Sequence, residues 1–231
     1  MSAQSQEPGT GLVIAVDGTS GSGKSSTSRR VAVRLGLRYL DTGAMYRAVT
    51  WWVLKQGIDP TDAAEVAERS VEPEIVSGTD PEAPTIEVDG KDVSVEIRGA
   101  DVNAAVSPVS AVPDVRARLL LLQRSAISAA VADGVGMVVE GRDIGSVVAP
   151  EAQVKVYLSA DPSARAARRS AEEGGSDLGR TQESLLNRDR IDSTREASPL
   201  VQADGAVHID TTDLTLEQVV ARVVELVEAA R

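Results

Sequence analysis

The chain of 231 residues contains no cysteine. Disulfides, thiolate metal sites and cysteine nucleophiles are therefore excluded together, and the composition is compatible with a reducing cytosol. No segment approaches the ~18 apolar residues that a membrane-spanning helix needs, and residues 1–11 have no apolar stretch of the signal-peptide type. The single histidine, His208, lies in a strand-like stretch, where we expect a structural role. We expect a cytoplasmic protein with a disordered N-terminus and no membrane partner.

Positive charge is also scarce, because 24 Lys and Arg stand against 35 Asp and Glu and give a net charge of −11. This balance argues against non-specific binding to nucleic acid or to an anionic membrane, since both need a basic surface. Only 4 of the basic residues are lysines and 20 are arginines, the type suited to bidentate phosphate contacts. A GC-rich genome explains the arginine total equally well, so only the placement of individual arginines is informative.

The central motif is Gly18 to Ser25, which reads G-T-S-G-S-G-K-S. It follows an apolar run, Leu12 to Val16, and precedes a helical stretch, Ser26 to Leu35, which is the setting of a phosphate-binding loop. Glycines let backbone N–H groups surround phosphate oxygens, and the following helix N-terminus adds partial positive charge. Lys24 supplies a mobile charge, and Ser25 can offer its hydroxyl to Mg²⁺. The alternatives are a plain Gly/Ser-rich turn and a loop that binds nucleotide without catalysing its conversion.

Strands and helices alternate along most of the chain, which predicts a mostly parallel sheet with helices on both faces. Strands are predicted at Leu12–Val16, Arg38–Leu40, Val135–Val139, Val154–Leu158 and Val207–Asp210. Helices are predicted at Ser26–Leu35, Ala44–Lys55, Pro113–Ala132, from Pro162 through Arg165, Arg168 and Arg169, at Thr181–Asp192 and at Thr215–Ala230. The apolar face of the long helix is assigned to Leu119, Leu122, Ile127 and Val131, and Thr215 with Gln218 fits a capping box.

Two segments interrupt this alternation. From Asp59 to about Gly99 the chain is rich in proline and acidic residues, and a hairpin is predicted around Asp89-Gly90 between Thr85–Val88 and Lys91–Val95. Gly174-Gly175-Ser176 is a hinge-like break before the second polar helix. Spacings of four and three then place Arg188, Asp192 and Arg195 on one helical face, where a solvated surface ion pair is the alternative interpretation.

Three polar clusters follow predicted strands: Asp17–Ser25, Asp41–Arg47 and Glu140–Asp143. Ligands of open α/β sheets bind at the carboxyl ends of the strands, so we expect these clusters to form one site. Together with Arg188, Asp192 and Arg195, these motifs resemble, in order and over nearly the whole chain, those of the bacterial cytidylate kinases, a family of nucleoside monophosphate kinases. Two positions differ from many members, since position 42 is Thr rather than Ser and position 140 is Glu rather than Asp.

The resemblance implies an α/β fold of the P-loop NTPase type, a parallel sheet flanked by helices with a small antiparallel-sheet insertion on the acceptor side and a helical lid. It implies a nucleotide-binding core at 12–58, 107–173 and 196–231. The inserted acceptor-binding domain would cover 59–106 and the lid 174–195, with residues 1–11 disordered.

The resemblance also implies site residues and a reaction. ATP would lie on Gly18, Thr19, Ser20, Gly21, Ser22, Gly23, Lys24, Ser25 and Ser26. The acceptor, CMP or dCMP, would contact Thr42, Tyr46, Arg47, Ser107, Arg116, Arg142, Asp143, Arg188, Asp192 and Arg195. Lys24, Arg142, Arg188 and Arg195 would act in catalysis, and Ser25 would contact Mg²⁺ through the nucleotide.

The expected activity is in-line transfer of the γ-phosphoryl group from ATP to CMP or dCMP by a monomeric enzyme. A P-loop kinase for another nucleoside monophosphate, or for a metabolite such as shikimate, is the nearest alternative. A GTPase-like switch or a non-catalytic nucleotide sensor is the alternative from a different class. The guanine-reading pattern N-K-x-D is absent from the sequence, which weighs against the GTPase.

Overall fold

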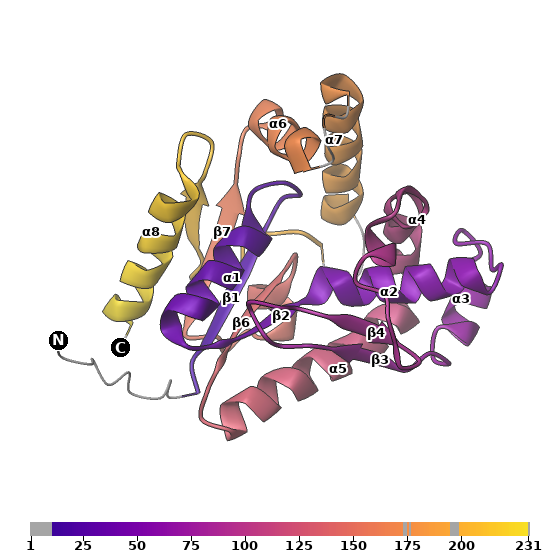
Figure 1. Cartoon of the computed structure of the whole chain (residues 1–231), viewed down its shortest axis with the longest axis horizontal. Helices are drawn as coiled ribbons and strands as arrows, with labels where there is room; N and C mark the ends of the chain where they lie inside the picture. Colours follow the sequence, from indigo (N-terminus) through magenta and orange to yellow (C-terminus); the bar gives the residue numbers. More distant parts are fainter. Residues whose placement is uncertain (1–10, 173–174, 176, 195–198, 231) are drawn as a thin grey trace.

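The computed structural model describes residues 11–172, 175, 177–194 and 199–230. Its centre is a sheet of five parallel strands in the order β2, β6, β1, β7, β8 (Figure 1). The strands are β2 (Arg38–Asp41), β6 (Met137–Gly141), β1 (Val13–Gly18), β7 (Val154–Ser159) and β8 (Val207–Asp210). The predicted parallel α/β sheet is confirmed.

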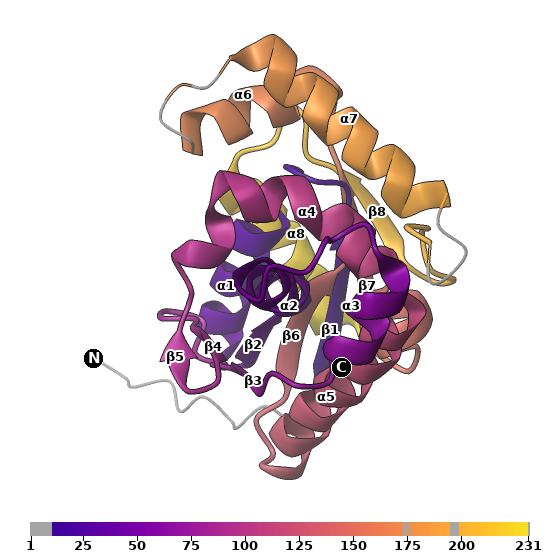
Figure 2. The same cartoon turned by 90° about the vertical axis from the view of Figure 1, so that its right-hand side faces the viewer.

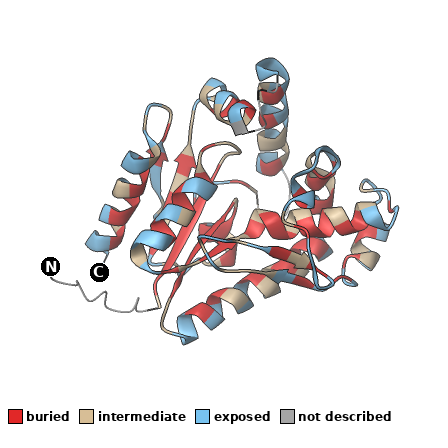
Figure 3. Ribbon diagram, viewed as in Figure 1, coloured by how far each residue is buried: buried red, intermediate tan, exposed pale blue. Residues whose placement is uncertain are grey.

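Helices cover both faces of this sheet. Helices α1 (Lys24–Leu35) and α8 (Leu216–Ala229) pack on one face, and α2 (Thr42–Lys55) and α5 (Pro113–Ala132) on the other. Along β1, Ile14 and Val16 face the first pair of helices while Val13 and Ala15 face the second. This two-sided burial explains why the strand is apolar at every position from Val13 to Val16 (Figure 3). Burying each Val or Ile side chain contributes about 1.5–3 kcal/mol.

The helix ends follow local sequence signals. The Asp41 side chain accepts a hydrogen bond from the Ala44 backbone N–H at 2.9 Å and so caps α2. The predicted capping box of Thr215 and Gln218 at the start of α8 is confirmed. In α5 the prediction for Val131 was wrong, because its side chain is 41% exposed and Ala130 lies in the core instead. Twelve residues after Leu119, a helix of 100° per residue has turned 120° away from the buried stripe.

The inserted segment contains a three-stranded antiparallel sheet of β3 (Ile75–Ser77), β4 (Ile86–Val88) and β5 (Lys91–Asp92). The predicted hairpin turn is present, with φ of 51° at Asp89 and 75° at Gly90, as a type I′ turn requires. Its second strand is shorter than predicted, and β3 was not predicted. The segment also holds α3 (Ala63–Arg69), a 3₁₀ turn η1 (Glu96–Arg98) and α4 (Ala100–Ala111).

Helices α6 (Pro162–Glu172) and α7 (Leu178–Thr194) pack against each other above the carboxyl ends of the strands (Figures 1 and 2). The second polar helix thus begins three residues before the predicted Thr181. Helix α4 reaches up from the insertion to contact α7, so the two segments approach each other over the sheet edge (Figure 2). Within the described residues, no helix is both long and apolar enough to span a membrane.

Candidate functional site

A cavity of about 590 Å³ lies where β1, β6 and β2 end. Its wall is formed by the glycine loop before α1, the N-terminal turns of α2, the segment after β6, the helix α4 and the inner face of α7. Because β2, β6 and β1 are neighbours in the sheet, the three polar clusters predicted from the sequence meet here. Residues of all three clusters therefore line one cavity.

Most of the predicted site residues line this cavity. They are Ser20, Gly21, Gly23, Lys24, Ser25, Ser26, Thr42, Tyr46, Arg47, Ser107, Arg116, Arg142, Asp143, Arg188 and Asp192. Gly18, Thr19 and Ser22 belong to the same loop without facing the cavity. Arg195 lies outside the described residues.

The glycine loop has the backbone geometry that its sequence predicts. Gly18 has φ of 148°, and a Cβ there would lie 2.0 Å from the Leu158 carbonyl oxygen, so only glycine fits between β1 and β7. Gly23 has φ of 88° and leads the chain into α1. The Lys24 Nζ donates to the Thr19 carbonyl at 2.7 Å across the loop. The loop therefore forms a closed turn that presents its lysine to the cavity.

Buried positive charges repel one another in this cavity. Burial and the nearby Arg142 lower the pKa of Lys24 to about 7. Burial, Arg188 and Arg169 lower the pKa of Arg47 to about 9. Burial and Arg142 lower the pKa of Arg188 to about 10. Eight lining side chains are cationic and four are acidic, in a chain whose net charge is −11. Such a site favours an anion that would relieve this repulsion.

The Arg47 side chain is held by the inserted segment. Its Nη1 donates to the Asn103 Oδ1 at 2.7 Å and to the Ile97 carbonyl at 3.0 Å. Asn103 in turn donates through Nδ2 to the Arg98 carbonyl at 3.2 Å, which fixes the orientation of its amide. The sequence analysis missed Asn103, because no motif marks it and α4 was not predicted.

Arg116 and Asp143 form a buried ion pair at 2.5 Å, although they come from α5 and from the segment after β6. The Arg116 Nη1 also donates to the Ser110 carbonyl at 3.2 Å, and the guanidinium lies 5.2 Å from the centre of the Tyr46 ring. The Arg116 Nε has no hydrogen-bond partner among the described residues. A planar ligand with acceptors could use this donor, since unpaired buried polar atoms are rare.

Helix α7 is attached to both the glycine loop and the segment after β6. The Arg142 Nε donates to the Asp192 Oδ2 at 3.0 Å. Asp189, which the sequence analysis did not single out, accepts the Ser20 backbone N–H at 3.1 Å and pairs with Arg165 of α6. These contacts place the Arg188 side of α7 over the cavity.

Glu140, the position that departs from the family pattern, is buried at the end of β6 and lines the cavity. Burial and the repulsion of Asp41 raise its pKa to about 7, while Lys24 and the Tyr39 and Ser25 hydroxyls act in the opposite direction. Its Oε1 accepts the Tyr39 hydroxyl at 2.6 Å, and its Oε2 has no partner within the described part of the chain.

A resident metal site built from the protein alone is not evident, since no group of three His, Cys, Asp or Glu residues among the described ones could hold an ion. The side chains do fit an Mg²⁺ ion carried by a nucleotide. The Ser25 hydroxyl lines the cavity, and the unpartnered Glu140 oxygen is an acceptor for a metal-bound water.

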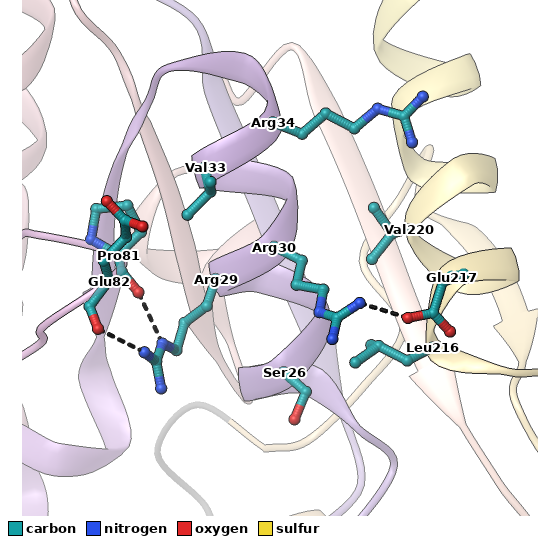
Figure 4. A pocket seen from close by; sticks show the side chains of 10 residues that line it. All are labelled: Ser26, Arg29, Arg30, Val33, Arg34, Pro81, Glu82, Leu216, Glu217 and Val220. Carbon is teal, nitrogen blue, oxygen red and sulfur yellow. Dashed lines mark hydrogen bonds and ion pairs between the residues drawn. The ribbon is translucent and has the colours of Figure 1, made fainter.

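A second hollow, of about 700 Å³, lies on the outer side of α1 between α8 and the loop at Pro81 (Figure 4). Arg29 donates there to the carbonyl oxygens of Pro81 and Glu82, and Arg30 pairs with Glu217 (Figure 4). Of the predicted site residues that the structure describes, only Ser26 borders it. The chemistry-bearing residues therefore belong to the first cavity.

Comparison with known proteins supports the family resemblance noted in the sequence. The family model for cytidylate kinase matches residues 14–229. A cytidylate kinase from Streptomyces avermitilis is 57% identical over 220 residues, covering 95% of this chain and 94% of the relative. Another, from Streptomyces griseus subsp. griseus, is 55% identical over 231 residues, covering 100% of this chain and 99% of the relative.

Among solved structures, an uncharacterized protein from Eubacterium ventriosum has a TM-score of 0.52 at 11% identity, covering 94% of this chain and 98% of that one. At that identity the likeness supports the fold alone. The two sequence relatives are stronger evidence of family than this structural likeness, because they match nearly the whole chain and are identical at more than half of the aligned positions. The chain therefore belongs to the cytidylate kinase family.

Proposed function

We propose that this chain phosphorylates CMP and dCMP with ATP, by in-line transfer of the γ-phosphoryl group to a phosphate oxygen of the acceptor. One observation carries the proposal beyond family membership: Lys24, Arg47, Arg142 and Arg188 converge on a single cavity. Two nucleotides repel each other, and several fixed cations between them lower that repulsion in the transition state.

The mechanism needs positioning and charge rather than a general base, because the acceptor phosphate is already ionised at neutral pH. The donor phosphates would lie on residues Gly18 to Ser26, with Lys24 on the outer phosphates. Arg47, Arg142, Arg188 and Arg195 would bind the acceptor phosphate and the transferred group. Thr42 and Asp192 would position the acceptor nucleotide.

The cytosine ring would lie between α4 and Arg116. Arg116 and Ser107 offer donors to the ring's O2 and N3, and Asp143 offers an acceptor to the exocyclic amine. The unpartnered Arg116 Nε and the nearby Tyr46 ring support this assignment. A base without this pattern would leave buried polar groups unpaired, which is the origin of selectivity in such a site.

Mg²⁺, bound through the ATP phosphates, would neutralise charge on the transferred group. Ser25 is the side chain that would contact it directly, and Glu140 would hold one of its waters. Both roles rest on the cavity position of Ser25 and on the free Glu140 oxygen.

Residues 59–106 would form an acceptor-side domain and 174–195 a lid that excludes water during transfer. The core would comprise 12–58, 107–173 and 196–231. We propose a cytoplasmic monomer that binds neither nucleic acid nor membrane. The absence of cysteine and the net charge of −11 support this placement.

The test is release of ADP, measured in a coupled assay with CMP, dCMP, UMP, AMP, dTMP and shikimate as acceptors. We expect CMP and dCMP to give the largest kcat/KM and expect little ADP without an acceptor. A clear preference for AMP or shikimate would contradict the substrate assignment. A protein that binds ATP yet releases no ADP on addition of CMP would be a sensor rather than a kinase.

A further inference from the structure

Tyr39 lies beneath the cavity, in the strand that neighbours β6. Strands β2 and β6 run parallel, with Tyr39 opposite Val138 and Asp41 opposite Glu140. Tyr39 therefore lies two residues before the position opposite Glu140, on the side away from the carboxyl ends of the strands. The phenol extends towards the strand ends, and its hydroxyl donates to the Glu140 Oε1 at 2.6 Å. Tyr39 is 1% exposed and does not line the cavity, so it reaches a ligand only through Glu140.

The two carboxylate oxygens of Glu140 have different surroundings. Oε1 is occupied by Tyr39, whereas Oε2 is buried without a hydrogen-bond partner among the described residues. Leaving a buried polar acceptor unpaired is unfavourable unless a ligand satisfies it. The groups that face Glu140 from the surrounding elements are Asp41, Lys24 and Ser25, and Ser25 and Lys24 belong to the glycine loop.

A glutamate has one more rotatable bond than an aspartate, so its carboxylate needs an anchor to keep one oxygen aimed at the loop. The nearby Lys24 attracts the carboxylate, and Asp41 repels it. A hydrogen bond from a rigid, buried phenol selects one rotamer among those that these charges allow.

We propose that Tyr39 is a positioning residue, whose hydroxyl fixes Oε1 of Glu140 so that Oε2 faces the hydrated magnesium of the nucleotide beside Ser25. This inference rests on the proposed function only for the identity of the ligand. Its structural basis is that Oε1 of Glu140 has a hydrogen-bond partner, whereas Oε2 has none among the described residues.

The first test is Tyr39→Phe, which keeps the ring in the core and removes only the hydroxyl. We expect the magnesium concentration for half-maximal rate to rise roughly ten- to a hundredfold, the size of losing one hydrogen bond to a charged group. The KM for CMP should stay unchanged. In calorimetry, binding of ADP with Mg²⁺ should weaken by the same factor, while binding of ADP in EDTA should not change.

A double-mutant cycle separates positioning from packing. Glu140→Asp shortens the side chain beyond the reach of Tyr39, so adding Tyr39→Phe to Glu140→Asp should cause no further change in magnesium requirement. Tyr157→Phe, which removes a tyrosine hydroxyl from β7 outside the cavity lining, is the matched control and should behave as the parent.

An unchanged magnesium requirement in Tyr39→Phe overturns the proposal. So does an equal loss when Tyr39→Phe is added to Glu140→Asp, because Tyr39 would then act independently of Glu140. The calorimetric arm needs no acceptor, so it decides the role of Tyr39 even for a protein that does not phosphorylate CMP.

Discussion

Individual side chains in the cavity show how an acidic protein can bind two anions. Lys24 is 8% exposed and donates its hydrogen bond to a backbone carbonyl, so within the described residues no carboxylate is in direct contact with its ammonium group. Arg47 is likewise held by neutral acceptors, the Asn103 amide and the Ile97 carbonyl. A neutral acceptor orients an ammonium or guanidinium group without neutralising its charge. Both cations therefore remain able to bind phosphate.

Lys24→Ala tests the assignment of the glycine loop. We expect the fold to be retained and kcat to fall by roughly 10²–10³-fold, as for the loss of one transition-state charge contact. Steady-state kinetics with circular dichroism measure both, and Lys55→Ala, at the exposed end of α2, is the control. Activity within about tenfold of the parent would be inconsistent with the role given to Lys24.

Asn103→Asp tests whether a neutral acceptor beside Arg47 matters. The new carboxylate would pair with Arg47 and repel the acceptor phosphate, so the KM for CMP should rise by roughly tenfold or more while that for ATP stays constant. Asn103→Ala, which removes the acceptor without adding charge, should have a smaller effect on the same parameter. If the two variants bind CMP equally well, charge at position 103 is irrelevant and Arg47 does not bind the phosphate.

At the level of elements, α7 is connected to the rest of the cavity wall through two carboxylates. Asp189 joins the Ser20 backbone to Arg165 of α6, and Asp192 joins α7 to Arg142. The sequence predicted a helix here because its polar periodicity is local. It could not predict the docking, because Ser20 and Asp189 are 169 positions apart. Helix α4 escaped prediction for a local reason, since Gly99 precedes it and Pro108 lies inside it.

Asp189→Ala would leave the Arg165 side chain, 4% exposed, without its carboxylate. Removing one partner of a buried pair costs about 3–5 kcal/mol, which for a chain of this size lowers Tm by roughly 6–20 °C. We also expect kcat/KM for ATP to fall, since α7 would be less firmly docked on the glycine loop. Differential scanning calorimetry and kinetics check both effects. Glu183→Ala, on the exposed face of the same helix, should change neither.

For the whole molecule, the buried Asp17 connects stability to pH. Its two carboxylate oxygens accept the backbone N–H groups of Ile144 and Gly145 at 2.8 Å, which joins β1 to the turn after β6. Burial raises its pKa from 3.8 to about 6, because the cost of desolvating the charge exceeds the effect of the two hydrogen bonds. Between about pH 4 and pH 6 the folded protein therefore keeps a proton that the unfolded chain has released.

The stability contributed by Asp17 is fully present below pH 3.8 and is lost as pH rises through 6. Between pH 5 and pH 7 the free energy of unfolding of the parent should fall by about 1 kcal/mol relative to Asp17→Asn, which does not titrate. Urea unfolding of both proteins at several pH values measures this difference. A difference that stays constant or grows with pH would show that Asp17 is ionised in the folded state throughout this range.

The linear sequence was sufficient for features that depend on near neighbours. The glycine loop, the strand and helix alternation, the Asp89-Gly90 turn and the Thr215 capping box are encoded within a few residues of each position, where backbone sterics and periodicity act. Long-range packing created the remaining features. Tyr39 meets Glu140 across 101 positions, and Arg47 meets Asn103 across 56. Such pairs depend on strand register and helix docking, which arise when distant apolar faces are buried together, so no local pattern contains them.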